Sequence, residues 1–199
     1  MSDSRKRAGK INRRTKETAI ELNFLLDGRG QAAIETGVGF MDHMLTLLAV
    51  HGFFDLTVNA RGDIQVDDHH TVEDLGICLG TALKEAAGDM AGIRRYGSSY
   101  VPMDEALVRV CVDISNRPFL HYNVVLRDQK VGSFDTSLAK EFFRAVSLHG
   151  GLTLHIDLLH GENTHHIIEA VFKALGKALA EAVTIDPRVS GQLSSKGIL

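Results

Sequence analysis

The sequence His69-His70-Thr71-Val72-Glu73 occurs again as His165-His166-Ile167-Ile168-Glu169, 96 residues further along the 199-residue chain. The dipeptides Leu56-Thr57 and Leu152-Thr153 are separated by the same offset. Several features that share one offset indicate an internal duplication, and a repeat of this length bears on the whole fold. We therefore expect one compact domain built from two similar halves.

Around this repeat, both halves show the same order of expected elements: strand, strand, helix, strand, helix. Alternating apolar residues indicate the strands, and apolar residues three and four apart indicate the helices. In the first half the strands are expected at 15–27, 31–36 and 55–60 and the helices at 40–51 and 71–87. In the second half the strands are expected at 104–115, 119–126 and 152–159 and the helices at 136–148 and 165–183. A turn signal at Asp27-Gly28 predicts that the first two strands pair as a hairpin.

The pattern predicts the α+β class, internally duplicated, with a roughly four-stranded sheet in each half and two helices on one face of each sheet. The expected division is a basic N-terminal arm at 1–12, a first half at 13–97, a second half at 98–185 and a polar tail at 186–199.

The composition argues against a nucleic-acid-binding, a secreted disulfide-bonded and a membrane-spanning protein. Hydrophobic residues make up 44% of the chain, and the net charge is −3, so no overall basic field points to nucleic acid. We expect the basic arm to be a solvated surface, with RNA binding as the alternative. Cys78 and Cys111 lie in apolar surroundings and predict no disulfide, and no secretory signal or membrane-spanning run is present. A cytoplasmic protein without a membrane partner is expected.

The chain has 10 histidines, and the paired motifs contain four of them. Residues three and four apart share a helix face, so each glutamate can join one histidine of its own pair. Adjacent residues point about 100° apart, so the two histidines of a pair can serve different metals. His43 and Glu141 occupy equivalent positions in the preceding helices and add one ligand each. By pseudo-symmetry, one metal is expected to take His43, His70, Glu73 and His165, and the other Glu141, His166, Glu169 and His69.

Imidazole and carboxylate donors without thiolate suit Mn, Fe, Zn, Co or Ni, and open positions favour six-coordinate Mn or Fe(II). The remaining histidines are expected to be structural or surface residues, with His155 in or near the core.

The sequence resembles the imidazoleglycerol-phosphate dehydratase family from about Arg13 to the C-terminus. Four segments carry the resemblance: Gly39–Met44, Asp67–Asp74, Asn163–Ala170 and Ser194–Gly197. The resemblance implies a metal-dependent lyase of histidine biosynthesis that converts D-erythro-imidazole glycerol phosphate to imidazole acetol phosphate and water. It implies two Mn²⁺ per active site, with the sites at subunit interfaces of a 24-subunit homo-oligomer. The hydrogen that is lost is not acidic, so metal coordination would make the imidazole ring an imidazolate and elimination would pass through a diazafulvene-like intermediate.

The resemblance also implies roles for single residues. Glu17 is implied as the acid–base residue, with Glu169 and Asp104 as further candidates. The substrate phosphate is implied to bind Arg95, Arg117, Ser194 and Lys196, with the tail becoming ordered on the ligand. The sequence departs from the family at Leu47, where many members have glutamine, and at Glu141, where some have histidine. A dinuclear phosphate-ester hydrolase and a non-catalytic metal-storage protein are the competing interpretations.

Overall fold

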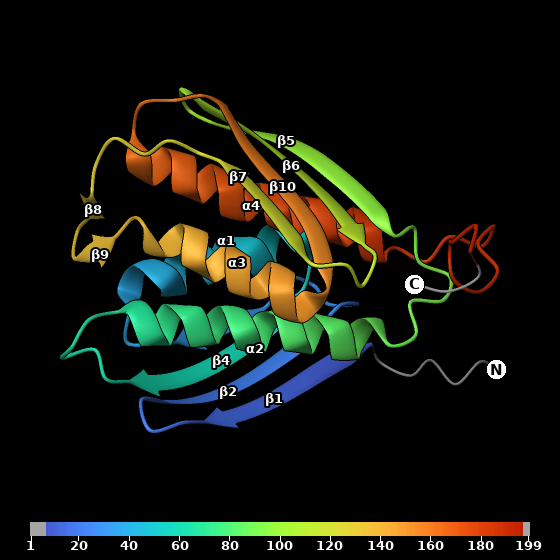
Figure 1. The fold of residues 1–199 in the computed structure, drawn as a ribbon, viewed down its shortest axis with the longest axis horizontal. Helices are drawn as coiled ribbons and strands as arrows, with labels where there is room; N and C mark the ends of the chain where they lie inside the picture. The colour runs from blue at the N-terminus through green and yellow to red at the C-terminus, as the bar shows by residue number, and fades with distance from the viewer. Residues whose placement is uncertain (1–6, 197–199) are drawn as a thin grey trace.

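The computed structural model describes residues 7–196. It contains two four-stranded sheets and four helices, and the helices lie between the two sheets (Figure 1). The first sheet has the order β1-β2-β4-β3, with β1 at Ala8–Arg14, β2 at Thr18–Leu25, β3 at Ala32–Glu35 and β4 at Asp55–Gly62. The second has the order β5-β6-β10-β7, with β5 at Tyr96–Met103, β6 at Ala106–Ile114, β7 at Phe119–Asn123 and β10 at Leu152–His160. The helices are α1 (Gly39–Gly52), α2 (His69–Ala87), α3 (Leu138–Gly150) and α4 (Thr164–Val183). The strands β8 (Lys130–Val131) and β9 (Phe134–Asp135) pair with each other as a small antiparallel hairpin.

The α+β class and the duplication are confirmed, because each element of the first half has a counterpart in the second. In both sheets the third strand, a helix and the fourth strand form a parallel crossover: β3-α1-β4 and β7-α3-β10. The helices cover one face of each sheet and pack on each other, α1 against α4 and α2 against α3. Within the described part of the chain, no helix is long and apolar enough to cross a membrane.

The expected hairpin of the first two strands is wrong. β3 pairs with β4 in parallel, and β4 lies between β2 and β3. A parallel pair needs a crossover connection, and α1 supplies it by carrying the chain across the face of the sheet.

The edge strands β1 and β5 were also missing from the expected elements. β1 begins at Ala8, so part of the segment expected to be the arm belongs to the first sheet, while residues 1–6 lie outside the described residues. β5 begins at Tyr96, two residues before the expected start of the second half. Both strands lie at sheet edges, where half of their side chains face solvent and weaken the apolar pattern.

Glycines allow the helix pairs to approach closely. A Cβ on Gly80 of α2 would lie 2.7 Å from a carbonyl oxygen of α3 and 2.8 Å from the backbone nitrogen of Gly150. A Cβ on Gly176 of α4 would lie 2.5 Å from a carbonyl oxygen of α1 and 3.1 Å from the nitrogen of Gly52. These two contacts are equivalent under the duplication, so the same backbone-to-backbone packing holds both helix pairs.

We expect Gly80→Ala and Gly176→Ala each to lower the free energy of unfolding by about 1–3 kcal/mol, because the new methyl group overlaps backbone that cannot move aside. Gly39→Ala is the matched control, since nothing lies within 4 Å of its added Cβ. Urea denaturation of the metal-free protein measures the three differences. Unchanged stability in both variants would contradict the close backbone-to-backbone packing of the two helix pairs.

Candidate metal centres and phosphate site

The two histidine pairs occupy the first turns of α2 and α4. The side chain of Asn163 accepts hydrogen bonds from the backbone nitrogens of His165 (2.9 Å) and His166 (3.3 Å) and so caps α4. Asp67 accepts a bond of 2.8 Å from the backbone nitrogen of His69 at the start of α2. These contacts fix where each helix begins and hence the direction in which each histidine of a pair points.

One histidine from each of two helices meets a buried carboxylate. Nε2 of His43 lies 3.4 Å and Nε2 of His165 lies 3.2 Å from Oε2 of Glu169. Lys173 lies 2.5 Å from the other oxygen, Oε1. Burial alone would raise the pKa of Glu169, but the hydrogen bond and charge of Lys173, with His43, hold that pKa below its usual value. Glu169 is therefore ionised, with Oε2 facing both imidazoles.

The equivalent residues of the other half form a second group at the α2–α3 contact. Nε2 of His69 lies 3.7 Å from Oε2 of Glu73. Nη2 of Arg144 lies 2.7 Å from Oε2 of Glu141 and 3.8 Å from Oε1 of Glu73. Here a cation already lies between two carboxylates. We call His43, His165 and Glu169 the first triad and Glu141, His69 and Glu73 the second triad.

Within one chain, this grouping differs from the expected ligand sets, which did not specify the subunit that supplies each ligand. Glu169, expected at the second metal, joins His43 and His165, whereas Glu73, expected beside them, lies against His69. The cause is the helix pairing, because α1 packs on α4 and α2 on α3, and the glutamate on each helix faces the histidine four residues before it.

His70 and His166, expected as ligands, lie outside both triads and contact carboxylates through Nδ1. Nδ1 of His70 lies 3.1 Å from Oδ2 of Asp63, and Nδ1 of His166 lies 2.8 Å from Oε2 of Glu105. These hydrogen bonds raise the pKa of both histidines above the usual value. The contact with His166 in turn lowers the pKa of Glu105 to about 2.

Two of the expected acid–base residues lie beside the Nε2 atoms of the same histidines. Oε1 of Glu17 is 3.9 Å from Nε2 of His70, and Oδ2 of Asp104 is 3.8 Å from Nε2 of His166. Asp104 occupies a two-residue hairpin turn with a positive φ of 47°, a conformation that aspartate tolerates better than most residues. The two histidines thus have similar carboxylate surroundings.

The donors of the triads fit a divalent transition metal. In the first triad one ligand atom from each residue lies within 4.8 Å of the others, the one such group of three in the described part of the chain. In the second triad, Oε2 of Glu141 is buried without a hydrogen bond of good geometry. Imidazole and carboxylate donors, with further positions to fill, suit Mn, Fe or Zn.

The residues expected to bind phosphate gather near the C-terminal end of α4. Arg95 is buried, 7% exposed, with Nε 2.6 Å from Oδ1 of Asp113 and Nη1 donating to the carbonyl of Leu193 at 2.7 Å. Arg117 reaches the same carboxylate at 3.6 Å. Arg95 and Ser194 line one pocket of about 560 Å³. The described part of the tail therefore closes over Arg95, and residues 197–199 lie outside the described residues.

Sequence reasoning missed Asp113 and Arg188 in this region. Asp113 forms ion pairs with both Arg95 and Arg117, and Arg188 lines the pocket beside Arg95. Asp113 pairs with Tyr96 across β5 and β6, and since β5 was not expected, nothing in the sequence pattern placed Asp113 beside Arg95.

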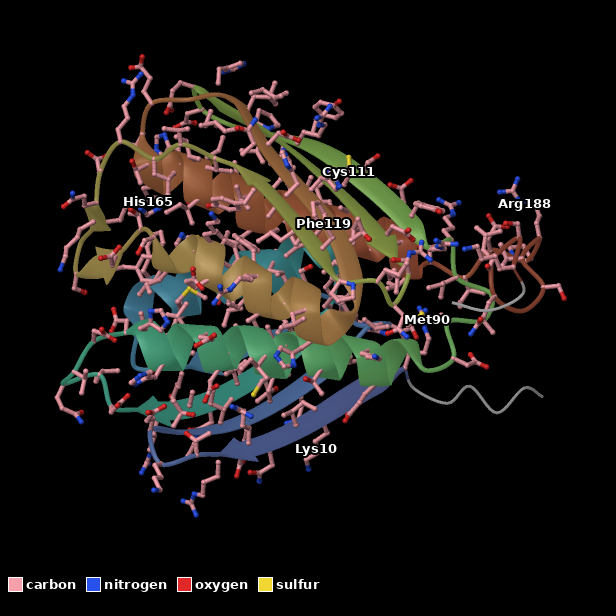
Figure 2. All side chains as sticks on the ribbon, viewed as in Figure 1. Lys10, Met90, Cys111, Phe119, His165 and Arg188 are labelled. Carbon is pink, nitrogen blue, oxygen red and sulfur yellow. The ribbon has the colours of Figure 1, made fainter. Side chains whose placement is uncertain are left out.

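Within one chain, the first triad and the pocket beside Arg95 are far apart. His165 lies near one end of the molecule and Arg188 near the opposite end (Figure 2). The 20-residue helix α4 separates them, a length of about 30 Å.

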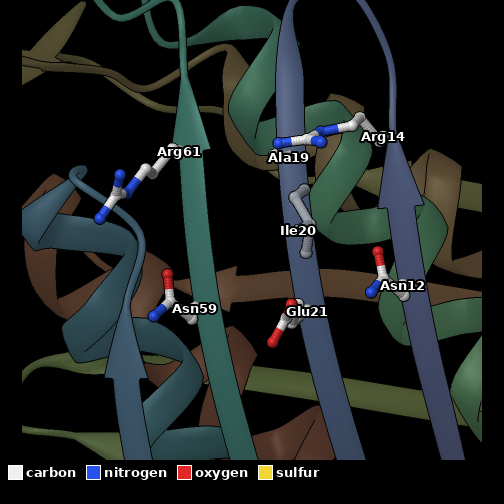
Figure 3. Close-up of a pocket in the computed structure, with 7 residues that line it drawn as sticks. All are labelled: Asn12, Arg14, Ala19, Ile20, Glu21, Asn59 and Arg61. Atoms are coloured by element: carbon white, nitrogen blue, oxygen red, sulfur yellow. The ribbon is translucent and has the colours of Figure 1, made fainter.

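A further pocket lies on the solvent face of the first sheet (Figure 3). Arg14, Ala19 and Arg61 stand in one row across β1, β2 and β4, and the next row is Asn12, Glu21 and Asn59. None of the expected site residues lines this pocket, so it is separate from both triads and from the pocket beside Arg95.

The expectation that His155 lies in or near the core is wrong. It is exposed on the outer face of β10, because Leu154 and Ile156 on either side of it point into the core. Leu47, which replaces the glutamine common in the family, is partly buried and packs against the core.

The chain is similar to known proteins of one family in both sequence and fold. The profile of the imidazoleglycerol-phosphate dehydratase family matches residues 36–179. The protein of that name from Desulfotalea psychrophila is 59% identical to this chain, over 97% of this chain and 96% of its own length. The one from Halalkalibacterium halodurans is 58% identical, over 97% of this chain and 100% of its own length. The crystal structure of the Staphylococcus aureus enzyme shares 46% identity with a TM-score of 0.82, over 90% of this chain and 99% of that one. The Pyrococcus furiosus structure, in complex with (S)-C348, shares 41% with a TM-score of 0.83, over 95% and 100%.

Proposed function

Because this chain belongs to the imidazoleglycerol-phosphate dehydratase family, a family of histidine-biosynthesis lyases, we propose that it dehydrates D-erythro-imidazole glycerol phosphate to imidazole acetol phosphate at a two-metal site. The observation that carries the metal part of this proposal is the equivalence of the two triads. His43, His165 and Glu169 correspond to Glu141, His69 and Glu73 under the duplication, and both groups combine imidazole and carboxylate donors.

Mn²⁺ is the metal that we propose, because harder carboxylate ligands supply one position of the first triad and two of the second. When bound, it supplies Lewis-acid chemistry that polarises the imidazole ring of the substrate. The triads would hold this ion, and Lys173 keeps Glu169 ionised for that task.

Proton transfer is assigned to Glu17. Its side chain is 53% exposed and lies beside Nε2 of His70, so a substrate bound there can reach the carboxylate. Asp104 holds the corresponding place beside His166 and is 71% exposed. Glu169 is a third acid–base candidate, although its position within a triad favours the ligand role.

We propose that the active site is completed by a neighbouring subunit. The substrate carries its imidazole and its phosphate on one three-carbon chain. In one chain, Ala182, whose carbonyl accepts a hydrogen bond from the backbone nitrogen of Arg95, lies 13 residues along α4 from Glu169 of the first triad, a separation of about 20 Å. A second copy must then bring its phosphate-binding residues to the triads. His70 and His166 complete the triads of neighbouring copies, and the family assembly of 24 subunits satisfies both needs. Exposed apolar side chains such as Phe53, Val66 and Val125 support burial in such interfaces.

A cytoplasmic location is part of the same proposal. Cys78 is buried and Cys111 is half-buried, and both are free thiols, which suits a reducing compartment.

Metal affinity is expected to fall as the pH is lowered from 8 to 6. The pKa values of His70 and His166 are raised by Asp63 and Glu105, so these imidazoles take up protons at a higher pH than ordinary histidines. A protonated imidazole cannot bind metal, so the loss begins above pH 6.5, the ordinary pKa of histidine. Electron paramagnetic resonance of free Mn²⁺ at several pH values measures the change. A constant affinity over this range would contradict the ligand role of the two histidines.

Arg117→Ala is expected to raise KM about 10- to 100-fold with Mn²⁺ content unchanged, because one charged hydrogen bond to the phosphate is lost. The side chain of Arg117 is 62% exposed, and Asp113 retains its ion pair with Arg95 when Arg117 is removed, so the fold should tolerate the change. Steady-state kinetics and metal analysis check both parts. An unchanged KM would remove Arg117 from the phosphate site.

Incubation of the Mn²⁺-loaded protein with imidazole glycerol phosphate tests the function itself. We expect the enolisable ketone imidazole acetol phosphate and no free inorganic phosphate. Release of phosphate without ketone would instead support a phosphate-ester hydrolase.

A further inference from the structure

We propose that Asp63 and Glu105 are positioning residues that orient His70 and His166 so that Nε2 of each imidazole is presented to a metal ion. The inference rests on the proposed two-metal function, and it concerns residues outside the triads and outside the implied ligand set.

In both imidazole rings, Nδ1 contacts a carboxylate and Nε2 does not contact that carboxylate. Nδ1 of His70 meets Asp63 at 3.1 Å, and Nδ1 of His166 meets Glu105 at 2.8 Å. A neutral imidazole that donates a hydrogen bond from Nδ1–H keeps the lone pair on Nε2. Metal-binding histidines commonly make such a bond to a carboxylate, which fixes the tautomer and the ring orientation. Nε2 is thus the nitrogen left for a metal in both rings.

Glu105 is itself held in place by the start of α4. Its Oε1 accepts hydrogen bonds from the backbone nitrogens of Asn163 (2.8 Å) and Glu162 (3.2 Å), while its Oε2 meets His166. One carboxylate therefore joins the β5–β6 turn, the loop before α4 and the histidine. Asp63 follows β4, has a side chain that is 19% exposed, and is anchored by its backbone nitrogen, which donates to the carbonyl of Glu17 at 3.1 Å.

The two carboxylates are not copies of each other. At the 96-residue offset of the repeat, Leu159 stands where a counterpart of Asp63 would be. Glu105 directly precedes β6 as Glu17 directly precedes β2, yet Glu17 lies near Nε2 of His70 instead of Nδ1. Different sequence positions thus supply the same Nδ1 contact in the two halves. A contact reached twice from different positions points to a requirement of the histidine, not to inheritance from the duplication.

Glu105→Gln and Asp63→Asn test the proposal, because each removes the charge and keeps the size. We expect each variant to bind Mn²⁺ about 10- to 100-fold more weakly than the wild type, measured by resonance of free Mn²⁺ during titration. Glu162→Gln is the matched control, an exposed neighbouring carboxylate whose partner is Arg127 at 3.8 Å, and its affinity should equal that of the wild type. Wild-type affinity in either positioning variant would overturn the proposal for that histidine.

A second measurement separates positioning from general stability. In a His166→Ala background, Glu105→Gln should cause no further loss of Mn²⁺ affinity, since the histidine it orients is gone. An equal loss in that background would overturn the positioning role. The Co²⁺-loaded Glu105→Gln protein should show an altered d–d absorption spectrum, and the Glu162→Gln protein an unchanged one. Failure of the wild type to bind Mn²⁺ at all would refute the two-metal function, whereas normal wild-type binding with unaffected variants would refute only the inference.

Discussion

Replacing Glu169 by glutamine is expected to lower kcat by about 10³-fold or more and to remove one Mn²⁺ per chain. Oε2 of Glu169 faces both His43 and His165, so the substitution takes the only carboxylate from the first triad. It also leaves the ammonium group of Lys173, which is 15% exposed, without its charged partner. Loss of the metal would remove its Lewis-acid contribution, which we expect to be at least as large as the roughly 10²- to 10⁴-fold that a positioned acid–base group supplies.

Glu21→Gln serves as the control for Glu169→Gln, because Glu21 is exposed on the outer face of the first sheet. Single-turnover kinetics together with metal analysis should show the full effect in Glu169→Gln and none in Glu21→Gln. Near-normal kcat in Glu169→Gln with both metals retained would contradict the first triad as a catalytic metal centre.

His70→Ala and His166→Ala are each expected to abolish measurable turnover while the metal-free chain stays folded. Both side chains are partly exposed, 35% and 26%, so their removal leaves no large cavity in the core. Under the proposed function, each variant lacks the imidazole that would complete a triad of a neighbouring copy, and a metal with one ligand fewer binds weakly.

His155→Ala provides the comparison for these variants, since His155 is an exposed histidine on the outer face of β10. It should keep wild-type turnover and metal content. Turnover in either His70→Ala or His166→Ala that matched His155→Ala would refute the ligand assignment.

Much of the fold could be predicted from side chains that recur at fixed offsets. The paired histidines and their glutamates mark the starts of α2 and α4, and the observed helices begin at His69 and Thr164, within two residues of the expected positions. These positions are predictable because helix periodicity and capping are local properties of the chain.

The composition of each triad was not predictable in the same way. Spacing shows that a glutamate shares a face with a histidine of its own helix, but it does not show which other helix packs there. The packing of α1 on α4, through Gly52 and Gly176, decides that His43 meets Glu169. The contacts of Asp63, Glu105 and Asp113 likewise join residues far apart in the sequence, and no local pattern encodes them.

Anomalous diffraction at the manganese edge, from crystals of the Mn²⁺-loaded protein, tests the two equivalent metal centres most directly. Two peaks per chain are expected. The first should lie against Oε2 of Glu169 and Nε2 of His43 and His165, and the second between Glu141, His69 and Glu73 with Arg144 displaced. A single peak, or peaks remote from both triads, would contradict the equivalence on which the proposed function depends.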